Sequence, residues 1–307
     1  MPHRHSIFDT IDLGATNNAD LYLPDGNFAI NVRGSHNIIS VGAGTEKVTL
    51  HAGSFNIVAL GTGDTQVTGT GNNNDVVIAS KLGDKASIKL SGEQEFIVAG
   101  QADARITANG DGAYVSTFNG DSTVIANGYG DLIAVGAGVN KITANGAHDL
   151  IYVAGPQDPQ YQTGGRTDMV QFDGDNDTIT FGHAKITGSA AGMHDRVYVD
   201  GTTIGSVLRL GDSSRIFLTP GSNLDLKLGM TDTVQIGNNL GDYTGTVKIE
   251  HLGLSTVQLY HLAGLDNFAA VEANLTHVPS NWNLSLPGGG DILFVGPKPT
   301  AANFSFA

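Results

Sequence analysis

Residues 127–155 read NGYGDLIAVGAGVNKITANGAHDLIYVAG, and within this stretch one phrase repeats almost unchanged. Asn127-Gly128 through Val135 returns as Asn145-Gly146 through Val153, a spacing of 18 residues. Between the two copies stands VGAGVNKIT, a nine-residue segment with an apolar position of its own. The stretch therefore indicates a nine-residue unit, two of which make one 18-residue repeat.

The nine-residue step extends well beyond this stretch. Stepping outward from Ile133 meets Val or Ile each time, with one step of ten residues and one of twelve: Ile39, Val48, Val58, Val67, Val76, Ile88, Ile97, Ile106, Val115, Val124, Ile133, Ile142 and Ile151. Glycine-rich turns between short β-branched segments are typical of turns and strands. Such a unit cannot close a core alone, so successive units must stack. We expect an all-β fold, a right-handed parallel β-solenoid with about 18 residues per coil.

The pattern resembles the glycine-rich nonapeptide of RTX proteins, G-G-x-G-x-D-x-U-x, which folds as a calcium-binding β-roll. VGAGVNKIT keeps two glycines and the apolar position but has Asn140 for Asp, and GYGDL keeps Asp131. In FDGDNDTIT, Asp177 and Ile179 fit, whereas Asp173 and Asp175 stand where glycine is expected. The resemblance covers residues 34–182, about half of the chain.

Calcium is the cofactor that this resemblance implies. Hard carboxylate and carbonyl oxygens suit Ca²⁺, and stacked coils place equivalent turns side by side. The candidate ligands are Asp131, Asp149, Asp173, Asp175 and Asp177. The alternative is that Asp and Asn at these turns only bind backbone groups, and ladders of Asn need no ion.

The chain divides into four expected segments. Residues 1–33 form an N-terminal cap and first coils, 34–155 the regular solenoid, 156–262 its irregular continuation with longer loops, and 263–307 a C-terminal cap with a candidate secretion signal. Prolines and a glycine pair predict a protruding loop at 156–168. LDNFAAVEANL, residues 265–275, has helical spacing and predicts a short capping helix.

The two strands of each coil differ on their outer sides. One wall carries an apolar stripe, for which we predict an interface formed by Ile38, Ile57, Phe96, Tyr114, Leu132 and Leu150. The cover of this stripe is the chain's own second half, another copy of the chain, or a ligand. The other wall carries a basic column with Lys47, Lys89, Arg105 and Lys141. That column serves solubility, or it contacts an anionic surface glycan.

Composition narrows the function. The 40 % hydrophobic residues can bury a core, and a net charge of −14 argues against nucleic acid as the partner. No cysteine is present, and no apolar run reaches the roughly 18 residues of a membrane span. No motif indicates an enzyme, and His3 and His5 are only a weak candidate metal pair.

The RTX resemblance implies export by a type I route that reads an uncleaved C-terminal signal, here PTAANFSFA. We therefore expect an extracellular, calcium-stabilised, self-assembling protein of a bacterial surface, forming an S-layer, a matrix filament or an adhesive array. The alternative is a module that binds or modifies surface polysaccharide.

Overall fold

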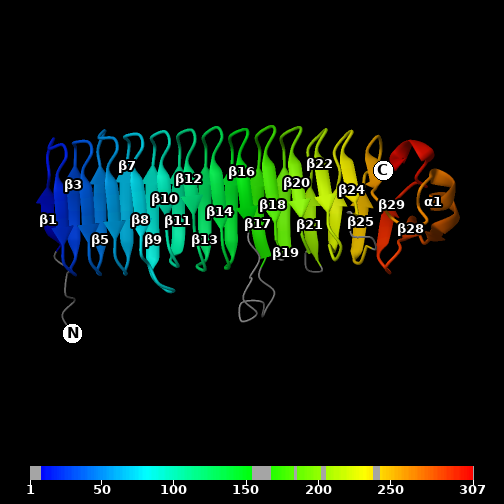
Figure 1. Cartoon of the computed structure of the whole chain (residues 1–307), viewed down its shortest axis with the longest axis horizontal. Coiled ribbons are helices and arrows are strands. Elements are labelled where there is room, and N and C mark those ends of the chain that lie inside the picture. The colour runs from blue at the N-terminus through cyan, green and yellow to red at the C-terminus, as the bar shows by residue number, and fades with distance from the viewer. Residues whose placement is uncertain (1–7, 154–166, 183–184, 202–204, 238–242, 307) are drawn as a thin grey trace. The chain divides into compact units, whose positions relative to one another are not determined.

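The computed structural model describes residues 8–153, 167–182, 185–201, 205–237 and 243–306. The chain divides into two compact units, Met1–Gly146 (unit 1) and Ala147–Ala307 (unit 2). Each unit is a parallel β-solenoid whose coils lie side by side (Figure 1). This confirms the predicted fold class. His3, His5 and most of the loop expected at 156–168 lie outside the described residues.

Unit 1 alternates between two walls, called sheet A and sheet B. Its sheet A contains β1 (Asp9–Asp12), β3 (Phe28–Val32), β5 (Glu46–Leu50), β7 (Thr65–Gly69), β9 (Lys85–Leu90), β11 (Asp103–Ala108), β13 (Ser122–Ala126) and β15 (Asn140–Ala144). Its sheet B contains β2 (Asp20–Leu23), β4 (Ile38–Val41), β6 (Ile57–Leu60), β8 (Asp75–Ile78), β10 (Phe96–Val98), β12 (Tyr114–Ser116) and β14 (Leu132–Val135). Strands pair in parallel in each wall, as Phe96 does with Tyr114, 18 residues on.

Unit 2 repeats this plan with longer and less regular turns. Its sheet A contains β17 (Thr167–Phe172), β19 (Lys185–Ala190), β21 (Ser206–Arg209), β23 (Leu224–Lys227), β25 (Thr246–Glu250), β29 (Asp291–Val295), β28 (Asn281–Ser285) and β27 (Leu275–Val278). Its sheet B contains β16 (Leu150–Val153), β18 (Thr178–Phe181), β20 (Arg196–Val199), β22 (Arg215–Leu218), β24 (Thr233–Ile236), β26 (Thr256–Leu259) and β30 (Phe304–Phe306). The described parts of this region form parallel coils of the same type, followed by a mixed antiparallel C-terminal part.

Strand alternation decides which side chains enter the core between the walls. In β14, Ile133 and Val135 are buried, whereas Leu132 and Ala134 face outward. The whole predicted Val/Ile series, from Ile39 to Ile151, is at most 1 % exposed. Each fully buried aliphatic side chain stabilises the fold by about 1.5–3 kcal/mol. The nine-residue step is therefore the spacing of the core.

The repeated Asn-Gly pair of the opening stretch has a structural cause. The amide of Asn127 donates to Asn109 at 2.7 Å, and the amide of Asn145 donates to Asn127 at 2.6 Å. The next residue lies so close to the preceding coil that a Cβ on Gly128 would collide with the carbonyl of Gly110. Asn ties neighbouring coils together at this turn, and Gly allows them to approach.

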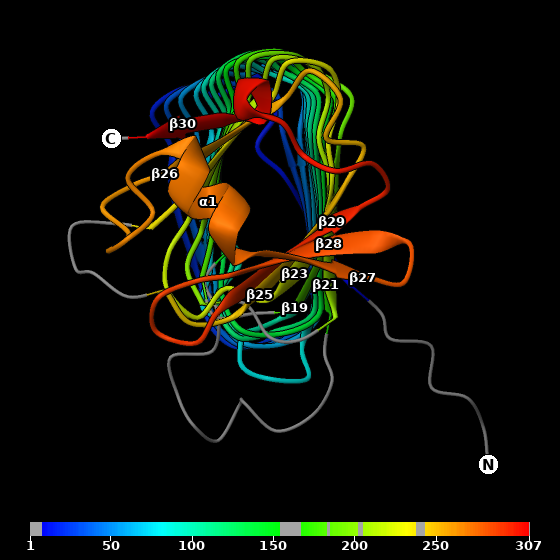
Figure 2. The ribbon, with the colours of Figure 1, turned by 90° about the vertical axis from the view of Figure 1, so that its right-hand side faces the viewer.

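The C-terminal end of unit 2 is closed by a small cap. The helix α1 (Phe268–Asn274) begins at Asn267, whose side chain accepts the N–H of Ala270, and it buries Val271. Figure 2 shows α1 and the antiparallel strands β27 and β28 at this end of the unit. The 3-10 turn η2 (Ala301–Asn303) leads into β30, the last strand of sheet B. The predicted capping helix is confirmed, and the end of the predicted secretion signal forms a strand.

Candidate functional site

The outer face of sheet B in unit 1 carries two parallel columns of side chains. The first, called the ridge, holds five of the six residues predicted as an interface: Ile38, Ile57, Phe96, Tyr114 and Leu132. Strand pairing aligns them, with Asp75 between Ile57 and Phe96. The rings of Phe96 and Tyr114 stack with centroids 4.8 Å apart. These side chains are therefore aligned in one stripe with one charged residue inside it, and the role of the stripe as an interface stays a prediction.

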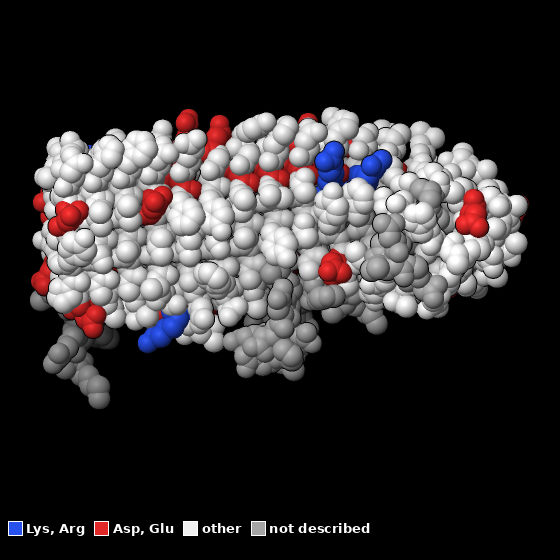
Figure 3. All heavy atoms as spheres, in the orientation of Figure 1, with Lys and Arg blue, Asp and Glu red and all other residues white. Residues whose placement is uncertain are grey.

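The ridge is accessible. Ile57 is 42 % exposed and Phe96 is 38 % exposed, and the other members are half-buried. The described parts of 156–262 form coils of unit 2, and which of the three predicted covers occupies the stripe stays open. The face in Figure 3 carries few charged side chains. Contiguous exposed apolar surface of this kind marks an interaction site.

The second column on this face, called the groove, lies two residues further along each strand. Its members are small: Ser40, Ala59, Val77, Val98, Ser116 and Ala134. Since the two columns are separated by about 7 Å, each large ridge residue has a small neighbour beside it. The face is consequently corrugated along the stacking direction.

Leu150, the sixth predicted interface residue, belongs to unit 2. It begins the corresponding column of that unit and is 44 % exposed. In register after it come polar residues, starting with Thr178 and Arg196. Arg215, next in register, lies over the ring of Phe217 at 5.9 Å. The outer face of sheet B is therefore apolar in unit 1 and mixed in unit 2.

A second periodic feature, called the corner ladder, consists of the residue that directly precedes each sheet B strand. In unit 1, Oδ1 of Asn56 accepts both the backbone N–H and the side-chain amide of Asn37, at 3.1 and 3.0 Å. Oδ1 of Asn74 accepts the same two groups from Asn56. These amides are fully buried. The side chains of Asn56 and Asn74 thus each accept a backbone and a side-chain hydrogen bond from the preceding coil.

In unit 2 the ladder is largely acidic. Oδ1 of Asp177 accepts the backbone N–H of Asp149 at 2.9 Å, and Oδ1 of Asp195 accepts that of Asp177 at 3.0 Å. Ser214, Asp232 and Ser255 continue the ladder. The buried Oδ2 atoms of Asp177 and Asp195 have no hydrogen-bond partner among the residues that the structure describes. Burial raises the pKa of each of these two carboxyls to about 7.

The five predicted calcium ligands occupy two kinds of position. Asp131, Asp149 and Asp177 are buried ladder residues, and Asp131 accepts the N–H groups of Ala113 and Gly128. Asp173 and Asp175 are exposed, the first bound by Gln171 and the second by the N–H of Met193. Among the residues that the structure describes, no three acidic or histidine side chains form a group that could hold a metal ion. Calcium binding stays a prediction, and the predicted alternative, backbone binding by Asp and Asn, is observed.

The predicted basic column lies on the outer face of sheet A in unit 1, where strand register aligns Lys47, Arg105 and Lys141. Lys89 lies in the neighbouring column, beside Thr68 and Thr107, so the prediction of one column is wrong for this residue. Lys47, Lys89, Arg105 and Lys141 are exposed, and none of them forms an ion pair with another described residue. Sheet A of unit 2 differs, because Lys248 binds Glu250 at 2.6 Å and Asp225 at 3.4 Å. Lys227 and Lys248 of unit 2 are therefore paired with acids, whereas in unit 1 Arg33 pairs with Asp12 and these four cations have no acidic partner among the described residues.

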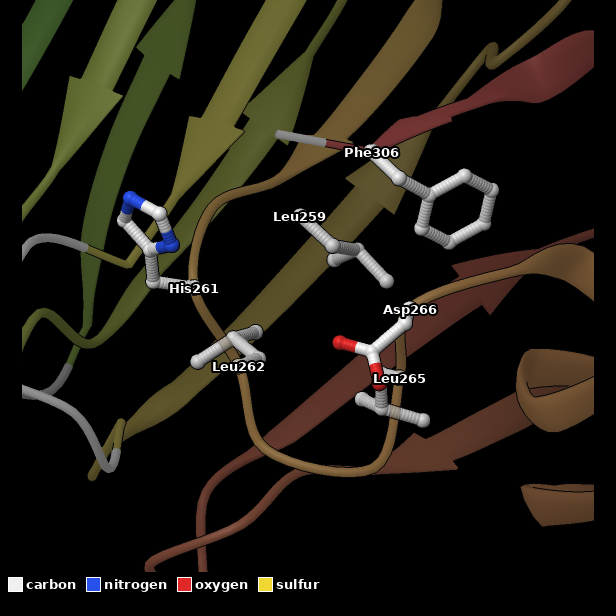
Figure 4. A pocket seen from close by; sticks show the side chains of 6 residues that line it. All are labelled: Leu259, His261, Leu262, Leu265, Asp266 and Phe306. Atoms are coloured by element: carbon white, nitrogen blue, oxygen red, sulfur yellow. The ribbon is translucent and has the colours of Figure 1, made fainter.

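A hollow of about 230 Å³ lies near the C-terminal cap of unit 2 (Figure 4). Its walls are Leu259, His261, Leu262, Leu265, Asp266 and Phe306. It is smaller than the roughly 300–1,000 Å³ of typical small-molecule sites. We assign no ligand to it.

Comparison with known proteins gives no relative. No protein-family model, curated protein or solved structure matches the chain. In the described segments, no helix is both long and apolar enough to cross a membrane. The RTX resemblance accordingly stays a prediction, while the parallel β-solenoid stands on the structure itself.

Proposed function

We propose that this chain is a structural protein that self-associates through the outer face of sheet B in unit 1. The observation that carries the proposal is the ridge, whose five large apolar side chains, two exposed and three half-buried, stand in register on one wall. Burying apolar area contributes about 25 cal/mol per Å². Covering half of each ridge side chain would stabilise a contact by several kcal/mol, since each such side chain is worth about 1.5–3 kcal/mol when fully buried.

We further propose an extracellular setting at a bacterial surface, in an S-layer, a matrix filament or an adhesive array. This part rests on the RTX resemblance, which also implies type I secretion and stabilisation by calcium. A solenoid that completes folding outside the cell, when calcium arrives, would suit such export because metal binding couples to folding.

The test is the assembly state of the intact chain. Sedimentation velocity and negative-stain imaging of the wild type, with and without calcium, should show concentration-dependent association. Leu132→Asp places a charge on the ridge and should shift the association constant at least about tenfold, equivalent to 1.4 kcal/mol. Thr123→Asp, on the outer face of sheet A, is the matched control and should associate like the wild type. A wild type that stays monomeric at about 100 μM, where even a weak protein pair is populated, contradicts the proposal.

A second candidate function is binding of an anionic surface polysaccharide by the basic column. The specific observation is that these cations lack acidic partners in unit 1, whereas the same face of unit 2 contains ion pairs. Replacing Lys47, Lys89 and Arg105 with Gln should abolish salt-sensitive binding to polygalacturonate. The matched control replaces Lys81, Arg196 and Arg215, which lie off this face, with Gln. This variant should retain the salt-sensitive binding to polygalacturonate. Equal loss in both variants would indicate only nonspecific charge attraction.

A further inference from the structure

The ridge and the groove have complementary sizes in five of the six sheet B strands of unit 1 from β4 to β14. The exception is β8, where Asp75 in the ridge is smaller than Val77 in the groove. Each ridge residue except Asp75 is larger than valine, and no groove residue exceeds valine. Ile57 stands beside Ala59, and Phe96 beside Val98. Parallel register repeats this arrangement from coil to coil. The face therefore has a raised strip and a sunken strip that run side by side along the stack.

Such a face can pair with itself in one orientation. A two-fold axis along the stacking direction, midway between two facing sheets, exchanges the ridge and the groove across the interface. The ridge of one copy then fills the groove of the other at the same coil height. Interdigitating walls of this type pack about 10 Å apart.

We infer that two copies of this chain pair through sheet B of unit 1 with their coils stacked in the same direction, ridge into groove. This inference rests on the proposed function, because it specifies the partner and the geometry of the same face. Ile57 of one copy lies against Ala59 of the second copy, and Phe96 lies against Val98 of the second copy. The contact is isologous, since the same surface serves both partners.

The other face-to-face two-fold arrangement fits less well. An axis along the strands through the β8 coil reverses the stacking direction of the second copy and sets ridge against ridge. Asp75 would then meet Asp75 of the second copy, and like charges in contact repel. The two grooves would face each other across a gap, which loses dispersion contacts.

The size of the face sets the concentration at which pairing should be seen. Six coils at about 4.8 Å and a strand width of about 13 Å give roughly 400 Å² of face per copy. Stable pairs usually bury about 800 Å² per partner. The pair is consequently weak and reversible, and its association is best measured at roughly tens to hundreds of micromolar, the range expected for small interfaces.

The test exchanges ridge and groove within one strand. Ala59→Leu fills the groove and should raise the dimer Kd about tenfold, the effect of overpacking by about 1.4 kcal/mol. Ile57→Ala alone should also weaken pairing, because it lowers the ridge. The double variant Ile57→Ala/Ala59→Leu should return to within about threefold of the wild type, since the enlarged groove side chain of one copy now meets the shortened ridge side chain of the second copy at the same height. Sedimentation equilibrium gives the constants, and circular dichroism verifies that each variant folds.

The outcomes separate the geometry from the function. Reversed stacking would bring Ala59 against Val98 of the second copy, so Ile57→Ala could not rescue Ala59→Leu. A double variant as weak as the sum of its singles therefore overturns ridge-into-groove pairing while self-association stands. Absence of any association in the wild type overturns the proposed function, and the inference with it.

Discussion

The corner ladder consists of amide side chains in the first coils of unit 1 and mainly of carboxylates in unit 2. In both units the side chain accepts the backbone N–H of the preceding ladder residue. Asn56 accepts from one neighbour and donates 3.0 Å to the next, so both ends of its side chain are used. Asp177 and Asp195 accept through Oδ1, and in the described part of the chain their buried Oδ2 atoms have no hydrogen-bond partner. Asn and Asp thus occupy equivalent ladder positions, but only the Asn amide can both accept and donate a hydrogen bond at every pH.

A proton on the carboxyl restores what the amide supplies. A neutral Asp carries an O–H that can donate as the side-chain N–H of Asn does. Burial raises the pKa of Asp177 and Asp195 from the ordinary 3.8 to about 7, with nearby Asp173, Asp175 and Asp232 adding to the effect. Between pH 3.8 and about pH 7, the native state therefore binds more protons than the unfolded state. The acidic ladder should therefore be most stable below about pH 4 and lose stability as the pH rises through 7.

The largest expected effect comes from making the acidic ladder neutral. Asp177→Asn/Asp195→Asn should raise the free energy of unfolding of unit 2 at pH 8 by about 2–4 kcal/mol, because two buried charges disappear. At pH 4 the double variant and the wild type should differ little. Urea unfolding followed by the fluorescence of Trp282, the only tryptophan and a residue of unit 2, measures both.

Asp173→Asn/Asp175→Asn is the matched control for that experiment. It makes the same chemical change at exposed positions of the same turn. This variant should keep most of the pH dependence of the free energy of unfolding of unit 2. If the exposed pair removes the dependence and the buried pair does not, the ladder is not its source.

The second prediction transfers an acid into the neutral ladder. Asn56→Asp removes the donor to Asn74 and buries a charge, so unit 1 should lose about 2–3 kcal/mol at pH 8. The loss should shrink at pH 4, where the carboxyl is protonated. Hydrogen exchange of residues 37–78, read by mass spectrometry, reports the local opening free energy.

Asn72→Asp tests whether burial, and not the acid itself, causes that loss. Asn72 is exposed and accepts the N–H of Glu93 at 3.1 Å, which a carboxylate can also do. Its exchange should match the wild type at both pH values. If Asn56→Asp and Asn72→Asp lower the local opening free energy equally, burial in the ladder is not the cause of the destabilisation.

The ladder also marks how far sequence reasoning reaches in this fold. The nine-residue Val/Ile step predicts the core and the two walls because strand alternation is strictly periodic. The same parity places Asp131 inward, two residues before Ile133, and an inward carboxyl at a turn favours backbone binding over an exposed calcium site. The observed backbone binding of Asp131 is therefore a consequence of that parity.

Other features had no sequence signal of comparable strength. Ser214 and Ser255 join the ladder at spacings of 19 and 23 residues, because the turns of unit 2 vary in length. The antiparallel strands β27 and β28 lie outside the repeat, so the nine-residue step does not predict them. Alternation also places Asp75 in the ridge, because it directly precedes Val76 as Ile57 precedes Val58, but the predicted stripe left it out.

The smallest expected effect concerns the outer faces of sheet A. In unit 2, Lys248 and Lys227 lower the pKa of Glu250 to about 2, so this group stabilises the native state above its ordinary pKa of 4.5 and less as the pH falls toward 2. Lys248→Met should cost at most about 1 kcal/mol at pH 7, because exposed ion pairs are weak, and the cost should vanish in roughly 1 M salt.

Lys47→Met in unit 1 removes a cation without an ion-pair partner among the described residues and should cost close to nothing. Urea unfolding with the same Trp282 signal reports the first change, and hydrogen exchange across β5 reports the second. Were both substitutions equally neutral at low salt, the ion pairs of unit 2 would contribute no stability, and the two sheet A faces would differ only in what they attract from solution.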